Sequence, residues 1–148
     1  MKKKHFYLVG VGGVVILLIF LITYFKPLSF ADNVSNNNQL KIVLNELGVR
    51  KGEPYINSVD WQTITTEQHS AILALFDKYT YKRTFVTLFS GSSISGSGNK
   101  TLSIYVYNDT SLLSSLFVSS SGKITVNKKR YNMENAEQFI EQVVEALK

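Results

Sequence analysis

The stretch LSIYVY, residues 102–107, decides the fold. Apolar side chains alternate along it with polar or aromatic ones. Because successive side chains of a β-strand point to opposite faces of the sheet, this alternation predicts a strand with one face in a core and the other toward solvent. The core side would carry Leu102, Ile104 and Val106, and the outer side Ser103, Tyr105 and Tyr107.

The same alternation of apolar and polar residues continues downstream of this strand. Residues 116–118 form a short apolar strand segment, and the turn sequence Ser121-Gly122 follows it. Beyond the turn, Ile124 and Val126 alternate with polar residues. This pattern is typical of two antiparallel strands with one solvated face.

The segments upstream are less regular. Leu40–Leu47 fits a strand by its alternation, or a helix that ends before Gly48, and the strand is slightly favoured. Residues 55–64 are predicted to be extended or irregular. The alternating aromatic and threonine residues of 85–89 predict another strand, and the serine-glycine sequence of 91–98 predicts a flexible hairpin loop.

Two segments have a helical period. Thr65 and Gln68, three residues apart, form a capping box, which predicts a helix that starts at Thr65 or Thr66 and ends near Tyr79. A second helix, capped by Asn132 or Asn135, closes the chain. Apolar residues recur on one stripe of each helix. These are Ile72, Phe76 and Tyr79 in the first, and Ala136, Phe139, Ile140, Val143 and Leu147 in the second.

Two helices and about four to six antiparallel strands on short connections predict an α+β fold, a small two-layer domain with an antiparallel sheet and two helices. Residues 40–148 are enough for one such domain and too few for two. The polar, asparagine-rich residues before it have little to bury, so residues 27–39 are predicted to be a linker.

The apolar composition of the N-terminal segment predicts an N-terminal transmembrane helix. Residues 6–25 are uncharged and apolar, with Lys2, Lys3 and Lys4 before them. A helix over this run would be about 30 Å long, the thickness of the hydrocarbon core of a bilayer. The flanking lysines favour a cytoplasmic N-terminus. We therefore expect a single-pass signal anchor at residues 1–26, in the cell membrane, with an extracellular C-terminal domain.

A cleavable signal peptide is the alternative. Ser29-Phe30-Ala31 provides small residues at the positions that precede a cleavage site, so cleavage after Ala31 would give a secreted protein. The apolar run exceeds the roughly 7–15 residues of an ordinary signal peptide, and Lys26 interrupts the approach to the site. The anchor is favoured, and both interpretations stay open at this point.

Composition limits the partners. The chain has no cysteine, which excludes both a disulfide framework and a lipid-modified cysteine. Four of its sixteen cations, Lys2, Lys3, Lys4 and Lys26, flank the apolar run, and the other twelve nearly balance eleven carboxylates. A nearly neutral domain gives no reason to expect a nucleic-acid partner. The expected partners are the lipid bilayer and another envelope protein, with the domain itself a monomer.

From residue 60 onward, the layout of the chain resembles short membrane-anchored exported domains of unknown function from Gram-positive bacteria. The resemblance rests on the T-x-E-Q-x-x-x-I-L-x-L-F pattern of residues 65–76, the step Lys82-Arg83-Thr84, the strand at 102–107 and the closing helix after Tyr131. It implies no activity and assigns no functional residue.

The sequence contains few residues in patterns typical of a catalytic or metal-binding site. His69 is the only histidine beyond the apolar run, and Glu67, two residues away, would lie on a different face of the helix. No serine stands in a G-x-S-x-G pattern. We predict no catalytic residue, no metal ligand and no cofactor.

Aromatic and basic residues on strands suggest a contact surface instead. Tyr105, Tyr107 and Arg130 are the candidate partner-binding residues, because tyrosine and arginine are enriched at interfaces. The simpler interpretation is a solvated strand face. Two functions stay open: a non-catalytic module that binds or shields another component of the cell envelope, and an envelope hydrolase with a dispersed active site. A pocket that joins His69 to a carboxylate and a serine would favour the hydrolase.

Overall fold

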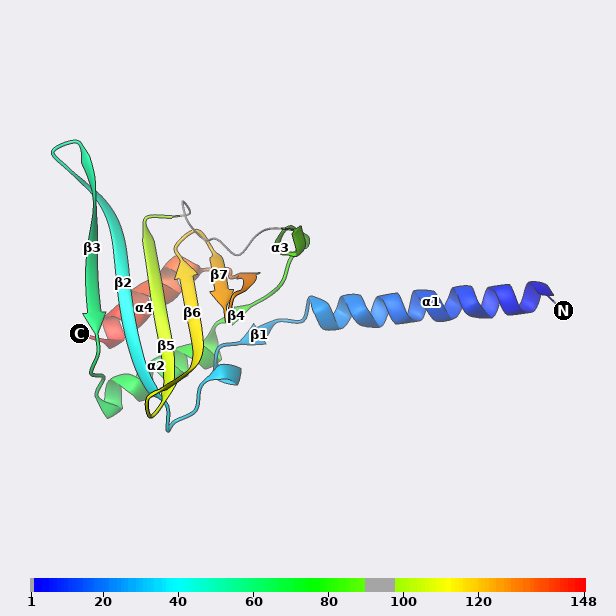
Figure 1. Cartoon of the computed structure of the whole chain (residues 1–148), viewed down its shortest axis with the longest axis horizontal. Coiled ribbons are helices and arrows are strands. Elements are labelled where there is room, and N and C mark those ends of the chain that lie inside the picture. Colours follow the sequence, from blue (N-terminus) through cyan, green and yellow to red (C-terminus); the bar gives the residue numbers. More distant parts are fainter. Residues whose placement is uncertain (1, 90–97) are drawn as a thin grey trace.

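The computed structural model describes residues 2–89 and 98–148, with side chains from 11 to 87 and from 98 onward. Over this part the chain is a mixed α+β structure (Figure 1). Its elements are α1 (Lys2–Tyr24), β1 (Leu28–Ser29), the 3-10 helix η1 (Ala31–Asn33), β2 (Gln39–Arg50), β3 (Glu53–Trp61), α2 (Thr66–Lys78), β4 (Thr80–Tyr81), α3 (Phe85–Phe89), β5 (Lys100–Asn108), β6 (Ser111–Ser119), β7 (Lys123–Val126), β8 (Lys129–Asn132) and α4 (Ala136–Ala146).

The central feature is a six-stranded antiparallel sheet in the order β3-β2-β5-β6-β7-β8. A two-stranded antiparallel sheet joins β1 to β4. The strand predicted at 102–107 is confirmed as part of β5, and its apolar side is buried as predicted. The ambiguous segment Leu40–Leu47 is a strand, part of β2.

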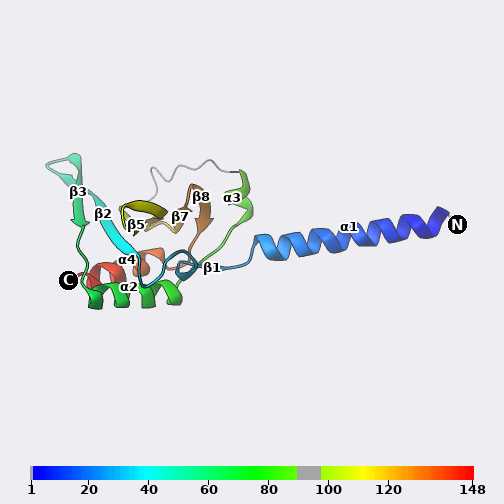
Figure 2. The same cartoon turned by 60° about the horizontal axis from the view of Figure 1, so that its bottom comes forward.

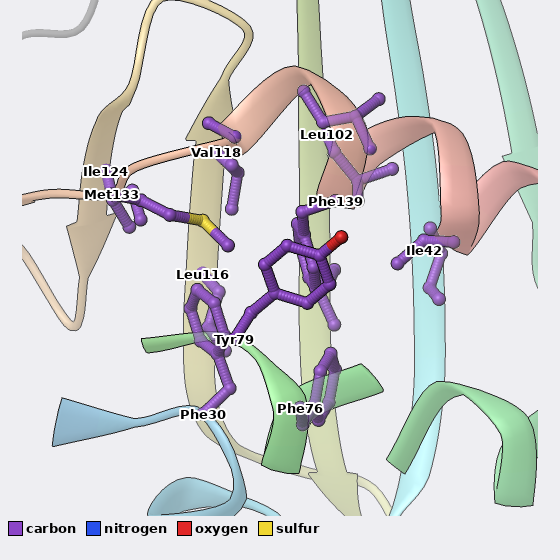
Figure 3. Close-up of a cluster of buried hydrophobic side chains, with 14 of the residues drawn as sticks. Phe30, Ile42, Phe76, Tyr79, Leu102, Leu116, Val118, Ile124, Met133 and Phe139 are labelled. Carbon is purple, nitrogen blue, oxygen red and sulfur yellow. The ribbon is translucent and has the colours of Figure 1, made fainter. Parts of the chain in front are cut away.

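Helices α2 and α4 lie against one face of the sheet and form the second layer (Figure 2). The predicted capping box starts α2: the Gln68 amide nitrogen donates to Thr65 Oγ1 at 3.2 Å, and the Thr65 nitrogen donates to Gln68 Oε1 at 3.0 Å. Phe76 and Phe139 meet between the layers, with ring centroids 6.3 Å apart (Figure 3). The predicted apolar stripes of both helices are therefore the helical side of the core.

The segment before β2 completes this core. Phe30 is fully buried, with its ring 5.3 Å from that of Phe139 and 4.7 Å from that of Tyr81. Ser29 Oγ donates to the carbonyl of Phe76 at 2.8 Å. The prediction that residues 27–39 are only a linker is wrong for 28–33, because a single aromatic residue carries no periodicity. Cleavage after Ala31 would remove Phe30 from the core.

Two elements differ from their predictions. The strand expected at 85–89 is the helix α3, which starts where the Thr84 nitrogen donates to Thr87 Oγ1 at 2.9 Å. Strand β8 was not predicted, because Lys129 and Arg130 break the apolar alternation. The glycine-rich loop predicted at 91–98 lies outside the described residues except for Gly98.

Helix α1 projects away from the domain (Figure 1). After its end, Phe25 contacts Phe85, with ring centroids 4.7 Å apart, and the Arg83 guanidinium lies 4.5 Å from the centroid of the Tyr24 ring.

In the part of the chain whose side chains the structure describes, no helix has the length and hydropathy needed to cross a membrane. This finding contradicts the transmembrane signal anchor predicted at residues 1–26. The extracellular location inferred from that anchor stays a prediction.

Candidate functional site

The face of the sheet opposite α2 and α4 carries an ordered row of side chains. Pairing between neighbouring strands places Val43 opposite Ser103, Ser103 opposite Phe117, Phe117 opposite Thr125, and Thr125 opposite Arg130. Position along each strand puts all five residues on the helix-free face, because the residues on both sides of the first four, and Tyr131 after Arg130, lie in the core. The row therefore crosses the sheet from β2 to its edge at β8.

The tyrosines predicted to form a contact surface lie beside this row. Tyr105 and Tyr107 are half-buried on the helix-free face of β5. The Tyr105 ring meets the Phe117 ring edge-on, with centroids 5.8 Å apart. Arg130 lies three strands away, and no contact between described residues joins it to either tyrosine. The structure thus groups Tyr105 with Phe117, a residue that the sequence analysis did not select.

A second surface, also missed from the sequence, is the β2–β3 hairpin, which extends beyond both helices (Figure 1). Leu47 is directly opposite Ile56, and Val49 is directly opposite Pro54. Leu47, Ile56 and Val49 are 55%, 68% and 74% exposed. We call Leu47, Val49, Pro54 and Ile56 the hairpin patch. It lies on the helix-free side of the hairpin, and two of its residues belong to β3, an edge strand that pairs only with β2 in the described sheet.

The hairpin is stiffened on its opposite side. Tyr55 lies directly across from Gly48, and its ring covers the glycine so closely that a Cβ atom there would be 2.6 Å from Tyr55 Cε1. An aromatic side chain packed over a strand glycine shields its backbone and fixes the register of the pair. The hairpin patch is therefore displayed on an ordered two-stranded ribbon.

His69 lies at the edge of a cavity of about 380 Å³ between α2 and the start of β2. Its Nε2 is 2.9 Å from the carbonyl oxygen of Asn38, and because a carbonyl only accepts, Nε2 carries the hydrogen. The described lining includes threonines and amides, among them Thr65, Thr66 and Gln62, but neither a carboxylate nor a serine. The residues needed by a hydrolase do not meet at His69.

Among the residues that the structure describes, no three acidic, histidine or cysteine side chains lie close enough to hold a metal ion. Comparison with protein-family models, with curated proteins and with solved structures finds no match for this chain. The resemblance to exported Gram-positive domains stays a prediction, and the function must be argued from the surfaces themselves.

Proposed function

We propose that this domain is a non-catalytic binding module that docks an extended segment of another protein on the free edge of β3, beside the hairpin patch. The observation that carries the proposal is the exposure of Leu47, Val49 and Ile56 on a hairpin that the domain does not use for its core. Exposed apolar residues grouped at one place are typical of a protein-binding surface.

The edge of β3 provides the main-chain half of the interaction. An unpaired strand edge presents backbone donors and acceptors that another strand can satisfy, and neighbouring side chains then provide specificity. Strand β3 contains two carboxylates, Glu53 and Asp60, and no cation. Asp60 is ion-paired with Lys41 at 3.3 Å, and Glu53 lies directly opposite Arg50. The exposed apolar residues, and not charge, therefore define the partner as an extended apolar segment.

The centre of the helix-free face is the second candidate surface. Tyr105 and Phe117 form an edge-on aromatic pair there, and Tyr107 and Arg130 share the face. Aromatic residues and arginine are the types enriched at interfaces, which supports a protein contact here. The hairpin patch has the larger exposed apolar side chains, so we rank it first.

The hydrolase alternative has less support. Its one histidine, His69, binds the Asn38 carbonyl through Nε2, and the described lining of its cavity lacks the acid and the nucleophile that hydrolysis would need. A contact function needs none of these groups.

The test is quantitative co-purification of the full-length chain from its own cells, followed by mass spectrometry. We expect the double variant Leu47→Ser/Ile56→Ser to reduce the captured partner at least about tenfold, which corresponds to a loss of about 1.4 kcal/mol. Leu112→Ser is the matched control. Leu112 is about as exposed as Leu47, but it lies at the start of β6, opposite Tyr107 and two strands away from β2.

Three outcomes separate the alternatives. Capture that survives in the hairpin variant but is lost in Tyr105→Ala or Tyr107→Ala would move the binding site to the centre of the helix-free face. A phenotype abolished by His69→Ala, with capture unchanged, would support the hydrolase instead. Equal loss in Leu112→Ser and in the hairpin variant would show that surface hydrophobicity, not the hairpin, causes the capture.

A further inference from the structure

A cavity of about 360 Å³ opens at the edge of the sheet opposite to β3. The β7–β8 hairpin forms one wall, and the chain around Thr84 and Thr87, at the start of α3, forms another. Backbone hydrogen bonds between Lys82 and Asn132 close its base, at 2.9 and 2.8 Å. The cavity is therefore framed by three segments that regular structure holds in place.

The charged residues that line this cavity are mostly cations. Lys82, Lys123 and Arg130 face a single carboxylate, that of Glu134. Lys82 Nζ lies 2.7 Å from Glu134 Oε1, so these two charges neutralise each other. In the described part of the chain, Lys123 and Arg130 have no carboxylate within ion-pair distance. The cavity thus has two uncompensated positive charges.

Arg130 also has an unmet hydrogen-bonding requirement. Its Nε is buried without an acceptor among the described residues. Thr125, directly opposite Arg130 on β7 and only 6% exposed, has a buried hydroxyl without a partner. A guanidinium stays protonated in proteins and a buried N–H without an acceptor is unfavourable, so the geometry of this site calls for an added acceptor.

We infer that this cavity is a binding site for an oxyanion, either a carboxylate or a phosphate group, held by Arg130 and Lys123. Arginine presents a planar set of N–H donors that matches two oxygens of one carboxylate or phosphate, and lysine adds charge without fixed direction. A cavity of this volume falls in the range of small-ligand sites, which is about 300–1,000 Å³.

This site is independent of the proposed docking edge. Strands β3 and β8 are the two opposite edges of the six-stranded sheet. A protein bound at β3 does not need the cavity, and an anion bound in the cavity does not need the hairpin patch. Failure of one proposal leaves the other intact.

The experiment is a titration of the isotope-labelled full-length chain with inorganic phosphate, and separately with acetate, followed by the NMR signal of the Arg130 Nε–H. We expect a saturable shift of this signal in at least one titration. Arg130→Gln should weaken binding at least about tenfold. Arg130→Lys should weaken it too, because the charge is kept but the planar donors are lost.

Lys129→Gln is the matched control. It removes the same charge from the neighbouring position of β8, but Lys129 does not line the cavity. We expect its affinity to stay within about twofold of the original, since neighbouring side chains of a strand point to opposite faces and the exposed charge of Lys129 is screened by salt. Equal weakening by Lys129→Gln and Arg130→Gln, or no shift of the Arg130 signal by either anion, would overturn the proposal.

A third titration distinguishes the sources of the anion. A soluble polymer of glycerol phosphate carries the same group as inorganic phosphate on a repeating chain. Tighter binding per phosphate group for the polymer would assign the site to a polymer, and equal affinity would assign it to the free ion. A lack of response to the polymer, phosphate and acetate alike would exclude the site.

Discussion

The two halves of β2 have similar amino acids and different surroundings. In the first half, Leu40, Ile42 and Leu44 lie under α2 and α4 and are buried. In the second half, Leu47 and Val49 lie on the other side of the strand, the helix-free side to which Val43 belongs, and are more than half exposed. One strand therefore belongs to the core at one end and to the surface at the other.

The difference suggests that the first half of β2 serves the stability of the fold and the second half serves binding. Burying an apolar side chain stabilises the fold by about 1.5–3 kcal/mol, so the first half is explained by folding alone. The second half gains nothing of this kind from the domain. Its apolar residues are explained if something else covers them, which is the basis of the proposed docking edge.

The largest effect should come from the core that the first half of β2 joins. Phe30→Ala should destabilise the domain by about 3–5 kcal/mol, because the ring fills the space among Phe76, Tyr81 and Phe139. Urea unfolding followed by circular dichroism measures the change. Phe85→Ala is the control, since that ring is mostly exposed. Equal unfolding midpoints for the two variants would contradict the placement of Phe30.

Two substitutions within β2 test the comparison directly. Ile42→Ala should destabilise the domain by about 2–5 kcal/mol, because Ile42 is fully buried opposite Ile104. Leu47→Ala should change stability by less than about 0.5 kcal/mol. Chemical denaturation of both variants gives the two values. A loss above about 1 kcal/mol for Leu47→Ala would show that the hairpin packs against the domain.

The last prediction concerns alkaline pH. Burial raises the pKa of the Tyr81 phenol from 10 to about 12, partly opposed by the hydrogen bond that Asn33 donates to it. The folded state therefore favours the neutral phenol. Its contribution to stability is complete below pH 10 and is lost as the pH rises through about 12.

Urea midpoints measured from pH 9 to pH 12 test this, with an absorbance titration of the phenolates in parallel. Tyr81→Phe should lose less stability over this range than the original chain, because a phenyl ring cannot ionise. The same loss in both chains would assign the alkaline instability to other tyrosines.

The sequence predicted the elements whose pattern has one interpretation. Strand β5 alternates without a break, and α2 has both a capping box and an apolar stripe. The segment 85–89 failed because alternating phenylalanine and threonine also fits a short helix, once Thr84 and Thr87 bond to each other. Strand β8 failed because its register depends on pairing with β7, where Asn127 and Lys128 turn the chain with positive φ angles of 47° and 67°.

The surfaces were harder to predict than the elements. Alternation assigned Tyr105 and Tyr107 to the outer face of β5, but the contact of Tyr105 with Phe117 follows from strand pairing, which one sequence does not show. The hairpin patch was missed because the length of β2 and its pairing with β3 do not follow from alternation alone; in the paired strands Leu47 and Val49 share the side of Val43, opposite to the core residues Leu40, Ile42 and Leu44. The partners in the oxyanion cavity come from three separate segments.

The burial of Phe30 also sets the order in which the protein can fold during synthesis. Phe30 leaves the ribosome before every other large core residue, and its partner Phe139 is made more than a hundred residues later. Contacts between distant parts of a chain form late, because a long loop must close first. Phe30 therefore lacks part of its ring contacts until Phe139 has been made, and a chaperone that holds apolar segments would be most needed during that interval.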